Sequence, residues 1–447
     1  MSGRANTCAA LEAAGYEAIA PVAGFLPGHA AEAASLTGLA ASERDQATAQ
    51  PWRVLGILSA LMGFASISTD LYLPAMPAMG KALDAPVGSI ELTVSGFLIG
   101  FSSGQLFWGP ISDRCGRRVP VAIGLALFVI GSAGCAMAGS AEAMIGWRIV
   151  QAVGACAGVV LGRAMVRDLY SGARAAQMLS TLMTVMAIAP LLGPIGGGQI
   201  LMLDGWRAIF WMLVVVGIAT LASLFTLPET LPPGRRNRQP LMTAFLRYGE
   251  LLRHRRLLAY AGAGGFFYGG MYAYIAGSPF AYITYHHVPA PLYGLLFALG
   301  ILGIMATNML NVRLVMSFGV DRLLIFGSGL SAVASVALAV AARTDLGGLI
   351  GLVAPLFLFV SAAGFIVANS MAGAMAGFPE RAGAVSALAG AIHYGSGILA
   401  SALVGAFADG TPWPMGWVIA VGGLGSLVCA ALLAKSQRRA RKEEGSE

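Results

Sequence analysis

The sequence predicts an all-α polytopic membrane protein with twelve transmembrane helices in two six-helix bundles. Three observations carry this prediction. Of the 447 residues, 57% are hydrophobic and 11% are charged, whereas soluble domains average about 25% charged residues. The mean hydropathy is +0.75. Apolar stretches of roughly 20 residues, the length that crosses a hydrocarbon core, recur along the chain.

The predicted spans form two sets separated by a basic linker. The first set covers 53–74, 89–111, 119–139, 142–165, 175–201 and 206–227. The second set covers 257–279, 291–315, 322–342, 347–371, 382–407 and 414–434. Six spans plus six around a long central loop are typical of transporters built from two related halves. The predicted domains are therefore a first bundle at 51–228, a linker at 229–256, a second bundle at 257–435 and a basic tail at 436–447.

Residues 1–50 differ from the rest, because they are rich in alanine and carry scattered glutamates. No basic stretch followed by an apolar one is present there, so this segment is not a signal peptide. Two interpretations stay open: a disordered extension, or a start codon assigned too early.

The distribution of basic residues predicts the orientation in the membrane. With a cytoplasmic N-terminus, the cytoplasmic loops and the C-terminal tail carry twenty Lys and Arg residues, against three in the outer loops. This asymmetry follows the positive-inside rule and places both termini in the cytoplasm. It also explains the net charge of +7 without any nucleic-acid partner.

The sequence argues against an ATPase or a metal-dependent enzyme. It contains no G-x-x-x-x-G-K-[ST] phosphate-binding loop, no H-E-x-x-H and no paired Cys-x-x-Cys. The five cysteines are interpreted as small packing residues. We therefore expect no enzyme activity, no cofactor and no metal.

Three motifs carry the candidate chemistry. The loop GPISDRCGRR after the second span combines Gly109, Asp113, Arg114 and Arg117 at the cytoplasmic face. Its charges suit a latch that breaks when two helix bundles move. The simpler alternative is a basic loop that only sets the orientation of the neighbouring helices in the membrane.

The fourth span contains RIVQAVG, with Arg148 and Gln151. A guanidinium inside the membrane costs about 2.5–3.5 kcal/mol on insertion scales, so Arg148 needs a polar neighbour or a position at the interface.

The fifth span contains GPIGGG, with Gly193, Pro194, Gly197 and Gly198. Its prolines remove backbone hydrogen bonds and its glycines allow close helix contact. Tight helix packing is the plain interpretation of this motif.

The spacing of these motifs resembles the major facilitator superfamily, whose signature loop is G-x-L-x-D-R-x-G-R-R. The segments DLYLPAMP (70–77), RDLY (167–170) and PETLPP (228–233) are similar to the Bcr/CflA branch of drug:proton antiporters, which confer bicyclomycin and chloramphenicol resistance. The resemblance covers roughly 52–435. It implies that Asp113 and Arg117 cluster with Asp168 as a conformational latch, that Arg148 takes part in proton coupling, and that the GPIGGG motif marks an antiporter.

Asp70, near the outer end of the first span, is the principal candidate for the proton-carrying group. Arg148 lies about 9 Å inside the fourth span, which runs in the opposite direction, so the two depths are comparable. Burial favours the protonated carboxyl and a guanidinium favours the ionised one, so conformation would control the proton. The alternative is that Asp70 only caps the loop before Pro74. Glu91, at the start of the second span, is the second candidate.

Polar side chains inside apolar runs are candidates for a substrate cavity. These are Gln105, Gln151, Tyr272, Asn369 and His393. For His393, helix packing is the alternative, and for Asn369 a hydrogen bond between helices.

The sequence therefore predicts a multi-pass exporter of the bacterial inner membrane, expected to be a monomer. Inward proton flow would drive out small amphiphilic drugs such as bicyclomycin or chloramphenicol by alternating access. A proton-coupled exporter of a metabolite, such as an amino acid or a sugar, is the alternative within the class. Two interpretations lie outside the transporter class. The sequence contains no motif of a membrane-embedded enzyme, and a receptor would not require two six-helix halves.

Overall fold

The computed structural model describes residues 51–444, except 171, 237–248 and 379–380, and in this part the chain forms helices and no strands. The described helices belong to one compact unit, Gln50–Glu447. The predicted all-α fold class is confirmed. The N-terminal extension 1–50 and the central part of the linker lie outside the described residues.

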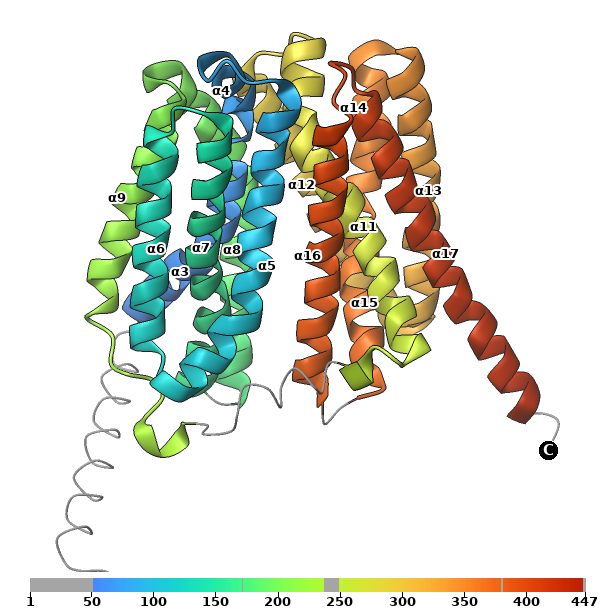
Figure 1. Cartoon of the computed structure of the whole chain (residues 1–447). Coiled ribbons are helices and arrows are strands. Elements are labelled where there is room, and N and C mark those ends of the chain that lie inside the picture. Colours follow the sequence, from blue (N-terminus) through green and yellow to red (C-terminus); the bar gives the residue numbers. More distant parts are fainter. Residues whose placement is uncertain (1–50, 171, 237–248, 379–380, 445–447) are drawn as a thin grey trace, which may run out of the picture. The chain divides into compact units, whose positions relative to one another are not determined.

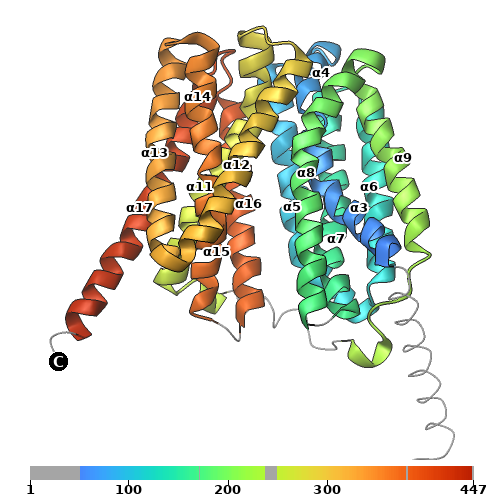
Figure 2. The same cartoon turned by 180° about the vertical axis from the view of Figure 1, so that it is seen from behind.

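The helices fall into two groups that lie side by side in both views (Figures 1 and 2). The first group comprises α3 (Pro51–Asp70), α4 (Met76–Ala82), α5 (Val87–Cys115), α6 (Arg118–Met137), α7 (Ala141–Leu169), α8 (Gly172–Asp204) and α9 (Trp206–Leu224). The second comprises α11 (Arg255–Pro279), α12 (Ala290–Phe318), α13 (Val320–Thr344), α14 (Gly348–Ser361), α15 (Ala363–Ala376), α16 (Ala382–Ala406) and α17 (Trp413–Glu444). Short connectors are η1 (Leu73–Ala75), η2 (Pro233–Arg235) and the π-helical η3 (Phe280–Tyr285).

Eleven segments of the described chain are long and apolar enough to span a membrane. The predicted span that is not among them is α11, which has 25 residues and is therefore long enough. Its six glycines and four tyrosines lower its hydropathy. The composition has a structural reason, because three of those tyrosines face a cavity between the two groups of helices.

Two predicted spans are interrupted in the structure. The first helix ends at Asp70, and Pro74 then opens a 3-10 turn that leads into α4. The predicted span 347–371 is divided into α14 and α15 at Ala362. The hydroxyl of Thr307 on α12 donates a hydrogen bond of 2.6 Å to the Ser361 carbonyl, which satisfies a backbone acceptor at this break.

Glycines allow α6 and α7 to touch through their backbones. A Cβ added at Gly154 of α7 would lie 2.4 Å from the Phe128 nitrogen and 2.5 Å from the Gly124 carbonyl oxygen of α6. The glycine of the fourth-span motif is therefore required for close helix packing.

Among the described residues, two helix pairs make most of the contact between the two halves. In the pair α5 and α16, a Cβ at Gly88 would lie 2.1 Å from the Gly405 carbonyl oxygen, and the hydroxyls of Ser95 and Ser401 are 2.8 Å apart. In the pair α8 and α12, a Cβ at Gly294 would lie 2.8 Å from the backbone of Ile195. Gly88, Gly405 and Gly294 lie near the helix ends that the sequence predicts to face outward.

Candidate functional site

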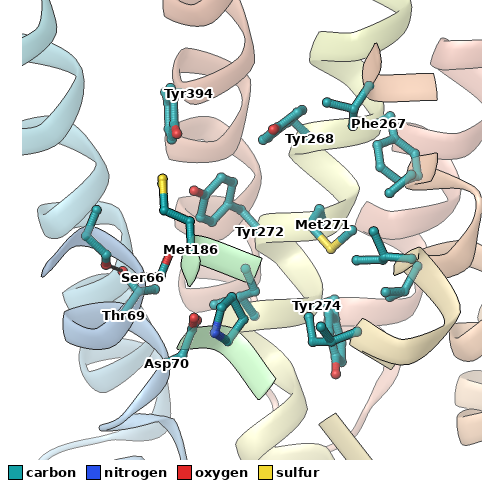
Figure 3. Close-up of a pocket in the computed structure, with 18 of the residues that line it drawn as sticks. Ser66, Thr69, Asp70, Met186, Phe267, Tyr268, Met271, Tyr272, Tyr274 and Tyr394 are labelled. Carbon is teal, nitrogen blue, oxygen red and sulfur yellow. Dashed lines mark hydrogen bonds between the residues drawn. The ribbon is translucent and has the colours of Figure 1, made fainter. Parts of the chain in front are cut away.

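A cavity of about 460 Å³ lies between the two halves, a volume suited to a drug-sized molecule (Figure 3). Helices of the first group and of the second both contribute to its wall. The wall is mainly apolar, and its aromatic members are Phe97, Phe101, Phe267, Tyr268, Tyr272, Tyr274, Phe297 and Tyr394. Among the described residues that line it, the charged ones are Asp70 and Arg163.

The aromatic wall joins the two halves. The ring of Phe101 on α5 lies 5.0 Å from that of Tyr394 on α16, measured between centroids. Tyr268 and Tyr272 of α11 follow at 6.3 Å, and the four-residue spacing places both on one helix face. Flat rings offer large contact areas and stacking that tolerates many partners.

Asp70 closes one end of the cavity. It is the last residue of α3, is 5% exposed, and lies beside the cavity together with Thr69 and Ser66 (Figure 3). A Cβ added at Gly193 of α8 would lie 3.0 Å from the Asp70 Cβ, so the fifth-span motif packs against the Cβ and backbone of Asp70.

Arg148 lies behind Asp70 and is completely buried. Its Nη1 donates to the Ser68 carbonyl at 2.9 Å and to the Gln151 Oε1 at 2.6 Å, and Gln151 Nε2 in turn donates to Ser132 at 2.8 Å. The bond to Ser68, two residues before Asp70, places the guanidinium and the carboxylate at the same depth. No ion pair between them occurs in the described residues.

The rings of Tyr72 and Phe97 cover the Arg148 guanidinium, with centroids 4.2 and 4.4 Å from its central carbon. Such cation–π contacts stabilise a cation that is removed from water. Among the described residues, Nε and Nη2 of Arg148 have no hydrogen-bond partner. The guanidinium is therefore held by aromatic faces and a few acceptors, with hydrogen-bonding capacity to spare.

Glu91 lies away from this cluster. It is 4% exposed, and its Oε2 has no hydrogen-bond partner in the part of the chain that the structure describes. A separate small pocket, with Thr284 and Pro412 in its wall, contains its side chain near the contact of α5 with α16. Glu91 does not line the central cavity.

The predicted latch residues meet between α5, α6 and α7. Arg117 donates to Asp113 at 2.6 Å, to Ser112 at 2.6 Å and to Asp168 at 2.8 Å. Arg117 is 7% exposed, whereas the Asp113 side chain is 47% exposed, so water reaches this cluster from the Asp113 side. Gly109 and Arg114 belong to the last turns of α5, where Arg114 is exposed.

Glu229 joins the same cluster, and the sequence analysis named it only as part of PETLPP. Its carboxylate accepts hydrogen bonds from the backbone nitrogen atoms of Arg117 at 2.8 Å and Arg118 at 3.2 Å. It therefore satisfies backbone donors at the start of α6, which an N-cap residue would otherwise do. Gly116, with a φ of +91°, lies against this carboxylate.

The fifth-span motif connects both halves to the Asp70 end of the cavity. A Cβ at Gly197 would lie 1.8 Å from the Leu71 carbonyl oxygen on the first half, and one at Gly198 would lie 3.1 Å from the Ala290 carbonyl oxygen on the second. Pro194 lies at the contact of α8 with Gly294. At this motif, α8 therefore packs against both the segment that follows α3 and the start of α12.

Of the five side chains predicted for a substrate cavity, Tyr272 lines it. The structure places the other four in protein contacts. Gln151 bonds to Arg148 and Ser132, and Asn369 donates to Asn311 at 2.7 Å. His393 is 3% exposed and stacks on Tyr268 at 4.8 Å. Gln105 lies near Gly390, between α5 and α16.

Arg163 is a cavity residue that the sequence analysis missed. The available signal was a charge inside the apolar fourth span, where an ionisable residue indicates function.

Comparison with known proteins identifies the family. The family model of the Major Facilitator Superfamily matches residues 58–280. An MFS-type transporter of Bacillus subtilis is 33% identical over 374 residues, which are 82% of this chain and 91% of that protein. The chain belongs to the major facilitator superfamily.

Two further relatives define the branch. A bicyclomycin resistance protein homolog of Haemophilus influenzae is 31% identical, with 81% of this chain and 90% of that protein covered. A chloramphenicol resistance protein of Pseudomonas aeruginosa is 32% identical, with 80% and 85% covered. The predicted resemblance to this drug-resistance branch of the superfamily is confirmed.

Solved structures of the superfamily show the same fold. The xylose transporter XylE from E. coli, in a partially occluded inward open conformation, matches with a TM-score of 0.66, at 16% identity, over 86% of this chain and 97% of that one. The nucleoside transporter NupG matches with a TM-score of 0.69, at 15% identity, over 86% and 98%. This facilitator-superfamily protein is a multi-pass membrane protein of a small-molecule transporter family.

Proposed function

We propose that the protein exports small amphiphilic, drug-like compounds in exchange for protons. The observation that carries this proposal is the position of Asp70, a membrane-embedded carboxylate at the end of an aromatic cavity of about 460 Å³. The names of its relatives, which include bicyclomycin and chloramphenicol resistance proteins, support drugs as the exported class.

In this proposal, the cavity serves both the proton on Asp70 and the substrate, one after the other in the transport cycle. A carboxylate that faces the cavity can take up a proton when the cavity opens outward and give it up when the cavity opens to the cytoplasm. Arg148 contributes a permanent positive charge at the same depth, because a guanidinium does not deprotonate in proteins. Its unused Nε and Nη2 donors could bind the ionised carboxylate after a small helix movement.

The contacts α5–α16 and α8–α12 support an alternating-access cycle. They join the halves at the end predicted to face outward, so we propose that this structure corresponds to a state closed on that side, with both termini in the cytoplasm. The Asp113–Arg117–Asp168 cluster lies within the first half at the opposite face, where we propose that it acts as a latch by holding α5 and α7 together.

Proton release from the detergent-purified protein tests this function. Addition of chloramphenicol or bicyclomycin to the wild type is expected to release protons, and Asp70→Asn is expected to bind drug without releasing them. Release that persists in Asp70→Asn would exclude Asp70 as the coupling group. Failure of both drugs to bind or to release protons would favour the metabolite exporter instead.

A further inference from the structure

Arg163 is a cation within a transmembrane helix, and no ion pair in the described part of the chain neutralises its charge. It belongs to α7, lines the central cavity and is exposed there. No hydrogen bond or ion pair joins it to another residue of the described chain. Arg163 lies near the cytoplasmic end of the predicted span 142–165, yet its side chain lines the cavity, and an ionisable residue of a membrane helix that faces a cavity indicates a function.

The surroundings of Arg163 suit an aromatic ligand. Tyr268 and Tyr394 line the same cavity as Arg163, and their ring centroids are 6.1 Å apart. A molecule bound in this cavity can therefore contact both the rings and the guanidinium. The combination of a guanidinium and flat ring faces binds an acidic group attached to an aromatic body.

Arg163 and Asp70 occupy opposite ends of the cavity. A Cβ added at Gly162 would lie 3.0 Å from the Met62 side chain, so Arg163 is level with Met62 of α3. Asp70 follows Met62 by eight residues, which corresponds to about 12 Å along the helix. The two charges are therefore separated by about the length of a drug-sized molecule, and one substrate can contact both regions.

We propose that Arg163 binds an acidic group of the substrate, so that the cavity selects aromatic amphiphiles carrying a carboxylate or a comparable anion. This inference rests on the proposed export function, since it assigns the substrate class of the same cavity. A neutral compound would still stack on the aromatic wall, but it would leave the Arg163 charge without a counter-ion.

A pair of fluorescent probes tests the proposal: a diethylaminocoumarin carboxylic acid and its primary amide. Binding to the full-length, detergent-purified protein is measured by fluorescence anisotropy. The wild type is expected to prefer the acid. In Arg163→Gln, binding of the acid is expected to weaken about tenfold or more, the value of a charge-assisted hydrogen bond, while binding of the amide changes less than about twofold.

Two control variants separate a contact from general effects. Arg163→Lys keeps the positive charge and is expected to retain most of the preference for the acid. Arg167→Gln removes a neighbouring charge of the same helix that does not line the cavity, and is expected to leave both affinities unchanged.

Three results would overturn the proposal: equal weakening of acid and amide, no effect of Arg163→Gln on either probe, or no binding of either probe to the wild type. Each leaves the export function to its own test, because proton release on addition of chloramphenicol or bicyclomycin does not depend on these probes.

Discussion

At the scale of single residues, Arg148 and Asp70 have different surroundings although they lie at the same depth. Arg148 is fully enclosed by the rings of Tyr72 and Phe97, and such contacts contribute up to about 2 kcal/mol each when water is excluded. Asp70 faces the cavity. The permanent charge of Arg148 is thus shielded from the cavity, and Asp70, the group able to exchange a proton, is the one that a substrate can contact.

Glu91 provides a test of this distinction. Because it lies outside the central cavity, Glu91→Gln is expected to retain drug-induced proton release in the assay that Asp70→Asn fails. The matched substitutions each remove one buried carboxylate from the first half. Loss of release in Glu91→Gln with drug binding intact would show that the coupling group is at the contact of α5 with α16.

At the scale of helices, small residues determine which elements pack together. Gly154 touches the backbone of α6, whereas a Cβ added at Gly146, earlier in the same helix, would meet no atom within 4 Å. The two glycines are in the same kind of secondary structure and differ in what surrounds them.

Alanine substitution at these two positions is expected to have opposite effects. Gly154→Ala overpacks a backbone contact, which typically costs about 1–3 kcal/mol, and should lower the thermal unfolding temperature of the purified protein by several degrees. Gly146→Ala is expected to raise that temperature slightly, because alanine favours the helix by about 0.5–1 kcal/mol. Equal shifts in both variants would contradict the assigned helix contact.

The positions of the helices could be predicted from the sequence, because a continuous apolar run of sufficient length has few alternatives in a membrane. The break at Ala362 could not, since it depends on a hydroxyl from another helix, that of Thr307. The residues of the cavity wall could not be predicted from the sequence either. Spans that are apolar all round do not reveal which face is inward, so the sequence leaves open whether Asn369 lines the cavity or bonds to another helix, and in the structure its amide donates to Asn311.

Sequence motifs did indicate the residues around the fixed charge. The spacing of Arg148 and Gln151 places both side chains on one helix face, where they are hydrogen-bonded. The contribution of Glu229 could not be predicted from spacing, because it caps a helix more than a hundred residues earlier in the chain.

At the scale of the molecule, Ser95 and Ser401 join the two halves. Their hydroxyl oxygens are 2.8 Å apart, close enough for a disulfide after Ser95→Cys and Ser401→Cys. In a background in which the native cysteines are replaced by alanine, oxidation is expected to cross-link the halves and stop drug efflux from proteoliposomes, and reduction should restore it.

The single variants Ser95→Cys and Ser401→Cys are the controls, and both should transport under oxidising conditions. Full transport by the cross-linked protein would show that these helices do not separate during the cycle.

The two ends of the cavity also determine how the membrane voltage acts on transport. If a neutral cargo leaves as one proton enters, one elementary charge crosses per cycle. If an anion held by Arg163 leaves instead, two charges move, and each contributes about 2.3 kcal/mol per 100 mV. A cell that is negative inside would therefore expel acids against a steeper concentration gradient than neutral compounds, through the same protein.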